Sequence, residues 1–235
     1  MLSYLWIFFT VSPNHPEGNS HHIEEDGILG LARRRVLVAA TQRSRWVEQS
    51  REALSLQTET LFDYCDRVLV EPDIPDRYSP AQIGVGLQLL FNNACGDYVF
   101  RYLEKNETRV ALDVERLKLL YANFFARYCD RHVRAIGEYN LDNAIAYLCY
   151  MFWDIFVVYP GNGSEKVMTA ALNVMKFGLH HENQSCIVSA LHGLGHWGGD
   201  VPVARIMLGN WLEHPPTDNP VLLAYARQAE MGCIQ

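Results

Sequence analysis

The chain of 235 residues is 49% hydrophobic and 20% charged, and it carries a formal net charge of −7 at pH 7. This length suffices for one large domain or two small ones, and the composition is that of an ordinary soluble globular protein. The acidic balance argues against nucleic acid as a partner.

Residues 1–27 are predicted to be an apolar start followed by a flexible linker. The stretch Leu2–Phe9 has no Lys or Arg before it and no small-residue cleavage signal before Pro13, which argues against a secretory signal. Residues 12–27 are rich in Pro, Gly, Asn and His, as linkers are. The six cysteines include no C-x-x-C pair, which favours buried thiols in a reducing compartment over disulfides or a zinc site. We therefore expect a cytoplasmic protein.

Residues 28–160 are predicted to be a helical region, formed either by degenerate repeats or by a different helical domain. The arginine-rich segment between Leu31 and Glu52 is interpreted as the solvated face of a helix rather than as a site for an anionic partner. Apolar residues recur at helical spacing as far as Val70. Ser79 followed by Pro80 is typical of the start of the next helix.

Further helices are expected in the second half of this region. Two short ones should occupy Ala81–Asn106, with a break near Asn92–Gly96. A long amphipathic helix is predicted over Arg109–Ile136, and Gly137 suits its end. No segment alternates apolar and polar residues over the length of a strand. The predicted fold class is all-α.

The most apolar stretch is Leu141–Tyr159, which would be about 28 Å long as a helix. That length is close to a bilayer's hydrocarbon thickness, so a membrane span is one interpretation. Asp154 argues against it, because an aspartate inside a spanning helix costs about 2.5 to 3.5 kcal/mol. We expect a central helix covered by its neighbours, and no membrane association.

Residues 161–235 contain an internal repeat of two helix-turn-helix units. A shift of 36 residues places Ser164 on Asp200 and brings several similar residues into register. The matched pairs are Val167 and Val203, Leu172 and Leu208, Met175 and Trp211, Asn183 and Asn219, and Ala190 and Ala226. A period of this length with two helices per unit is typical of α-solenoid repeats.

These units resemble HEAT-type α-solenoid repeats, and Cys186–Trp197 also resembles a stretch of uncharacterised bacterial helical-repeat proteins. The resemblance implies an α-α superhelix of antiparallel helix pairs that acts as a protein-binding scaffold. Leu191 and Leu194 map onto Arg227 and Glu230 one unit later, so the last helix is expected to expose a polar face, as a terminal solenoid repeat does.

A histidine-rich segment offers the alternative function. His192 and His196 stand four residues apart, close enough on a helix to share a metal ion. Candidates for a further ligand are His180, His181, Glu182 and Asp154. The competing interpretation is that the two histidines belong to the polar stripe of an amphipathic helix. Gly193 and Gly195 each cost this helix about 1 kcal/mol, which predicts the close approach of a neighbouring helix.

No motif fixes a reaction, so a non-catalytic scaffold that binds another protein is the preferred prediction. Its docking surface is expected to comprise Ser189, His192, His196, Tyr225 and Gln228. Double replacement of both histidines by Gln should then weaken binding with little loss of stability. No cofactor is predicted, and the oligomeric state is left open. The alternative is a metal-dependent enzyme or metal-binding protein that uses the cluster from His180 to His196.

Overall fold

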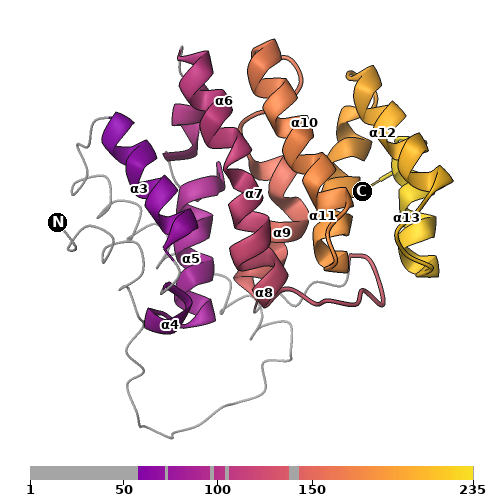
Figure 1. Ribbon diagram of the computed structural model, residues 1–235, viewed down its shortest axis with the longest axis horizontal. Helices are drawn as coiled ribbons and strands as arrows, with labels where there is room; N and C mark the ends of the chain where they lie inside the picture. The colour runs from indigo at the N-terminus through magenta and orange to yellow at the C-terminus, as the bar shows by residue number, and fades with distance from the viewer. Residues whose placement is uncertain (1–57, 72–73, 96–97, 104–105, 138–142, 235) are drawn as a thin grey trace, which may run out of the picture.

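The computed structural model describes residues 58–71, 74–95, 98–103, 106–137 and 143–234, and its regular elements there are all helical, without a strand (Figure 1). The predicted all-α class is therefore confirmed for the described residues. Leu2–Phe9, the linker and the arginine-rich segment up to Glu52 lie outside them. In chain order the elements are α3 (Thr58–Val70), α4 (Ile74–Arg77), α5 (Pro80–Phe91), the 3-10 helix η1 (Tyr98–Leu103), α6 (Glu107–Glu115), α7 (Leu117–Leu120), the π-helix η2 (Tyr121–Phe125), α8 (Ala126–Tyr128), α9 (Ala144–Ile155), α10 (Glu165–Leu179), α11 (Gln184–Trp197), α12 (Pro202–Glu213) and α13 (Pro220–Glu230).

The helices are spread along the longest axis of the molecule, from α3 near one end to α12 and α13 at the other (Figure 1). In one layer α6 packs against α10, and in the other α5, α9, α11 and α13 pack in succession. The layers are joined by antiparallel hairpins, α10 with α11 and α12 with α13. These two hairpins lie where the sequence predicts two helix-turn-helix units, within residues 161–235. The helix α11 therefore has a neighbour on either side within its own layer.

Local capping chemistry explains several helix starts. Ser79 and Gln82 form a capping box before Pro80: the Ser79 backbone N–H donates to Gln82 Oε1 at 3.0 Å, and the Gln82 N–H donates to Ser79 Oγ at 3.4 Å. This satisfies two backbone donors that a helix start leaves without partners. The helix start predicted at Ser79–Pro80 is confirmed. The helical pattern predicted as far as Val70 corresponds to α3, which ends at that residue, and the short helix α4 lies between the two.

Three asparagines cap the successive helices α9, α11 and α13. The Oδ1 atoms of Asn143, Asn183 and Asn219 each accept the N–H of the residue two positions on, at 3.1, 2.9 and 2.9 Å. Their Nδ2 atoms donate to the carbonyls of Tyr128, Cys129 and Val133, respectively, at 3.2, 3.1 and 2.8 Å. The same three side chains therefore start three helices and hold one segment of chain against them.

The segment begins at the end of α8, and its residues 129–137 are not helical, so the prediction of a single helix over Arg109–Ile136 is wrong. The helical stretch is interrupted at Arg116, passes through the π-turn η2 and ends at Tyr128. Beyond it the backbone bonds to the start of α11 instead of to itself. The Gln184 N–H donates to the Arg131 carbonyl at 3.1 Å, and the Val133 N–H donates to Gln184 Oε1 at 2.8 Å. Tertiary hydrogen bonds thus override the amphipathic pattern of the sequence.

The apolar helix α9 is shorter than the predicted Leu141–Tyr159 and lies between α5 and α11. It contributes buried aromatic side chains to the core, among them Phe152, which contacts Phe91, Phe125 and Phe156. None of the described helices is both long and apolar enough to cross a bilayer. The expectation of a central covered helix is confirmed, and Asp154 falls in its last turn.

Two glycines of α11 allow close approach of the helices on either side, as the sequence predicts. A Cβ atom on Gly193 would lie 2.5 Å from Trp153 Cγ of α9. One on Gly195 would lie 3.0 Å from the Ala229 backbone of α13 and 2.5 Å from Ile234 Cδ1. Because Trp153 precedes Asp154, the contact at Gly193 also brings that carboxylate against α11.

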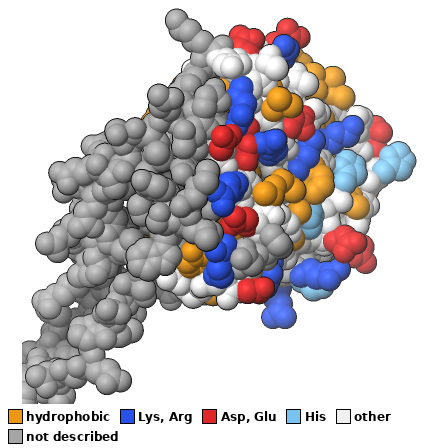
Figure 2. Space-filling model, turned by 60° about the vertical axis from the view of Figure 1, so that its left-hand side comes forward, with side chains coloured by type: hydrophobic (Ala, Val, Ile, Leu, Met, Phe, Trp, Pro, Cys, Tyr) orange, Lys and Arg blue, Asp and Glu red, His pale blue; other side chains and the backbone are white. Residues whose placement is uncertain are grey.

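On the face shown in Figure 2, positively and negatively charged side chains of the described residues are intermingled. Arg109 contacts Asp63 at 3.1 Å and Asp113 at 2.8 Å, which links α6 to α3. Arg67 and Glu71 form a further pair at 3.1 Å. These mixed pairs are ordinary for a surface and define no single-sign patch.

Candidate metal centre

A buried imidazole and a carboxylate meet between α9 and α11. His192 is wholly buried, and its Nε2 atom lies 2.8 Å from Asp154 Oδ2. Asp154 projects from the last turn of α9, where the side chain retains 24% exposure. The close helix approach at Gly193 makes this contact possible.

His196 completes a cluster of three donors. It lies one helical turn beyond His192, and its Nε2 atom is 3.4 Å from the other carboxylate oxygen, Asp154 Oδ1. The ligand atoms of Asp154, His192 and His196 all lie within 4.8 Å of one another. Zinc bonds of about 2.0 to 2.1 Å in tetrahedral array place ligand atoms about 3.3 Å apart, so small side-chain adjustments would suit an ion.

The cluster is open on one side. His196 keeps 40% of its side-chain exposure, whereas His192 keeps 1%. Burial lowers the pKa of His196 below its usual value, and His192 contributes in the same direction, although the Asp154 carboxylate opposes them. A lowered pKa keeps this imidazole neutral at physiological pH, which is the form that binds a metal.

A shell of aromatic side chains surrounds His192. Its Nδ1 atom lies 2.5 Å from the Tyr225 hydroxyl of α13, and that hydroxyl lies 3.1 Å from the hydroxyl of Tyr150. The Tyr150 ring also packs on the imidazole, with centroids 4.3 Å apart. Both nitrogens of the buried ring are therefore engaged, one by the carboxylate and one by a phenol.

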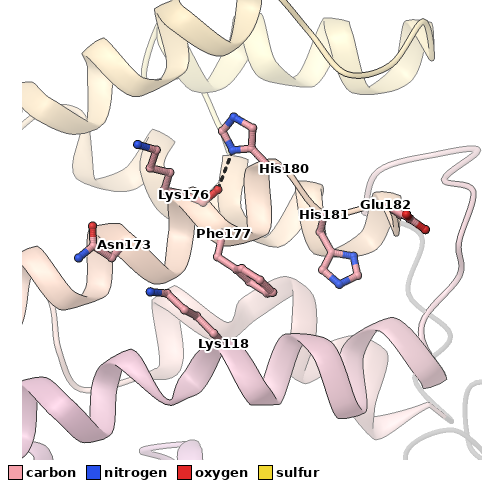
Figure 3. Close-up of a pocket in the computed structure, with 7 residues that line it drawn as sticks. All are labelled: Lys118, Asn173, Lys176, Phe177, His180, His181 and Glu182. Carbon is pink, nitrogen blue, oxygen red and sulfur yellow. Dashed lines mark hydrogen bonds between the residues drawn. The ribbon is translucent and has the colours of Figure 1, made fainter.

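The structure brings His192, His196 and Asp154 together but places the other two candidate histidines elsewhere. His180 Nδ1 donates to the Lys176 carbonyl at 2.9 Å, and His181 Nδ1 accepts the Asn183 N–H at 2.9 Å. Figure 3 shows their rings projecting away from each other at a surface hollow of about 700 Å³, which Glu182 also lines. Hydrogen bonding with Cys186 raises the pKa of His181. Neither ring belongs to the three-donor cluster.

The residues predicted to form a docking surface are divided between the interior and the surface. Ser189, His192 and Tyr225 are buried, and Ser189 Oγ lies 2.8 Å from the Tyr121 hydroxyl. His196 and Gln228 are exposed. Tyr225 and Gln228 line a surface groove of about 860 Å³. Of the five residues predicted to contact a partner, only His196 and Gln228 are therefore exposed.

Sequence reasoning proposed Asp154 as a candidate ligand but missed the hydrogen bond between His192 and Tyr225. The predicted 36-residue register gave a partial signal, because it aligned Tyr225 of α13 with Ser189 of α11. No family model, curated protein or solved structure matches the chain. The site must therefore be interpreted from its own chemistry.

Proposed function

We propose that the protein binds a divalent transition metal of the zinc class through Asp154, His192 and His196. The observation that carries the proposal is the convergence of one carboxylate and two imidazole nitrogens within 4.8 Å. Nitrogen and oxygen donors of this kind are typical zinc ligands. The lowered pKa of His196 supports binding at neutral pH.

The donor number and exposure favour an open centre over a closed structural one. Structural zinc sites have four protein ligands, whereas catalytic sites have three and leave a position for water. Here three donors converge beside solvent, with Asp154 and His196 partly exposed. A metal in such a centre lowers the pKa of its bound water to about 7, so metal-assisted hydrolysis is the reaction class we assign.

Metal analysis tests this function directly. Protein purified without an affinity tag should bind Zn²⁺ and Co²⁺ with one ion per chain in calorimetric titration. His196→Gln should weaken binding at least about 10-fold, because one of three ligands is lost. His180→Gln is the matched control and should bind as the wild type does. Absence of a one-to-one site, or equal binding by the His196 variant, would exclude the proposed centre.

We also propose that the centre is carried by a HEAT-like α-solenoid, an α-α superhelix of antiparallel helix pairs that binds a protein partner. The order of the helices along the long axis and the 36-residue spacing of the capping residues Asn183 and Asn219 support this proposal (Figure 1). The groove lined by Tyr225 and Gln228 is the docking site we assign.

The scaffold proposal is tested by comparing partner capture between two variants. A native partner captured by the wild type should be lost with Gln228→Arg, which fills the groove. Lys176→Glu, on the hollow of α10, should leave capture unchanged. Failure to recover a specific partner, or equal capture by the Gln228 variant, would count against a scaffold.

A further inference from the structure

His192 is the only ligand of the proposed centre that is wholly buried, and the contacts of its ring determine which nitrogen faces a metal. Asp154 engages Nε2 at 2.8 Å, and Tyr225 engages Nδ1 at 2.5 Å. A neutral imidazole carries one N–H, so one of these nitrogens donates and the other accepts.

The direction of both hydrogen bonds follows from the carboxylate. An ionised carboxylate only accepts, so without metal Nε2 carries the hydrogen and donates it to Asp154. Nδ1 then accepts from the Tyr225 hydroxyl. A metal on Nε2 requires that nitrogen to be bare, so the ring hydrogen must reside on Nδ1. Tyr225 then becomes the acceptor, because its oxygen lies within hydrogen-bond distance.

We propose that Tyr225 is the positioning residue of this centre, and that metal binding moves the His192 hydrogen from Nε2 to Nδ1 and reverses the bond to Tyr225. The inference rests on the proposed metal site. The neutral ring keeps one hydrogen throughout, so the exchange releases no net proton. Metal-binding histidines generally donate their other N–H to a neighbouring acceptor, which fixes the ring and strengthens the ligand.

Tyr225 lies on a different hairpin from the metal ligands, so its role would connect metal binding to the packing of that hairpin. Asp154 lies on α9 and the two histidines on α11, whereas Tyr225 belongs to α13 of the following hairpin. The contact of α13 with α11 is close, because Gly195 lies against Ala229. Metal affinity is therefore linked to the docking of the α12–α13 hairpin, and the linkage is reciprocal.

Two measurements test the inference. In Zn²⁺ competition with a chromophoric chelator, Tyr225→Phe should bind about 10 to 100-fold more weakly than the wild type. Gln228→Ala is the control, since Gln228 lies on the same helix as Tyr225 but is exposed and outside the three-donor cluster. In wild-type protein, two-bond ¹H–¹⁵N correlations should place the His192 hydrogen on Nε2 without metal and on Nδ1 with Zn²⁺. The second measurement needs no variant to fold.

The outcomes separate the two proposals. If the wild type binds no Zn²⁺, the proposed metal function fails. If it binds Zn²⁺ but Tyr225→Phe matches it within about 2-fold, the positioning role fails and the metal site stands. If His192 instead keeps its hydrogen on Nε2 in the Zn²⁺-loaded protein, that nitrogen cannot be a ligand, and both the positioning role and the three-residue centre fail.

Discussion

At the scale of single residues, burial separates two histidines that look alike in the sequence. His192 is inside the protein with a partner on each nitrogen, whereas His196 lies at the edge of the cluster with 40% of its side chain exposed. The same substitution should therefore have different consequences at the two positions. Because His192 is buried, replacing both histidines by Gln should destabilise the protein, contrary to the expectation from the sequence.

His192→Gln should lower the free energy of unfolding by about 2 to 4 kcal/mol, because the Tyr225 hydroxyl and the Asp154 carboxylate both lose their hydrogen bond to the imidazole. His196→Gln should change it by about 0.5 kcal/mol or less, as a surface replacement does. Urea denaturation of the metal-free variants measures both values. Equal losses would mean that the His192 hydrogen bonds contribute little.

The lowered pKa of His196 gives stability a defined pH dependence. Its folded pKa lies below the usual value of 6.5, so the unfolded chain takes up the proton first. The contribution of His196 is therefore fully present above about pH 6.5 and is lost as the pH falls through its folded pKa. Denaturation of metal-free wild type and His196→Gln between pH 5 and 8 should show the wild type losing more stability on acidification. Parallel curves would contradict this assignment.

At the scale of elements, the spacing between helices is set by residues without side chains. Gly193 lets Trp153 of α9 lie against α11, and Trp153 Nε1 then donates to the Tyr121 hydroxyl at 2.9 Å. The glycines themselves indicated a close neighbour, and that expectation is confirmed. Which helix approaches at each glycine could not be predicted, because it depends on contacts between residues far apart in the chain, such as Asp154 and His192, which are 38 positions apart.

Gly193→Ala should destabilise the protein by about 1 to 3 kcal/mol, because its Cβ would overlap Trp153 and force α9 away. Gly209→Ala in α12 is the matched control, since its Cβ would meet nothing nearer than 3.5 Å. There the gain in helix propensity of about 1 kcal/mol should make the variant neutral or more stable. Thermal unfolding compares the pair, and a neutral Gly193 variant would show that α9 can move freely.

At the scale of the whole molecule, helix type and local starts were predictable and long-range tethers were not. Ser79 and Pro80 signal a helix start through their own chemistry, and the structure confirms it. The amphipathic pattern up to Ile136 predicted helix, but bonds from Gln184 and Asn219 hold residues 131–133 in a loop. Such bonds join segments more than 50 residues apart. For the same reason the sequence offered Asp154 only as one of four candidates for a further ligand and could not single it out.

The terminal hairpin allows a test of packing at this scale. Leu194 is completely buried, and Leu194→Ala should cost about 2 to 5 kcal/mol as a core truncation. Glu230, on the last helix, should tolerate Ala within about 0.5 kcal/mol. Chemical denaturation measures both. A similar effect at the two positions would argue against a polar outer face on α13.

The asparagines that cap α9, α11 and α13 have a consequence for enzymatic digestion. Arg131 and Arg134 are exposed residues in a non-helical stretch, which is where trypsin ordinarily nicks a folded protein. A protease must draw several residues into its cleft, but here the Arg131 carbonyl and both backbone groups of Val133 are already bonded to helix starts. Cleavage would require local opening at the starts of both α11 and α13, so a segment that looks like an ordinary surface loop should resist trypsin almost as a helix does.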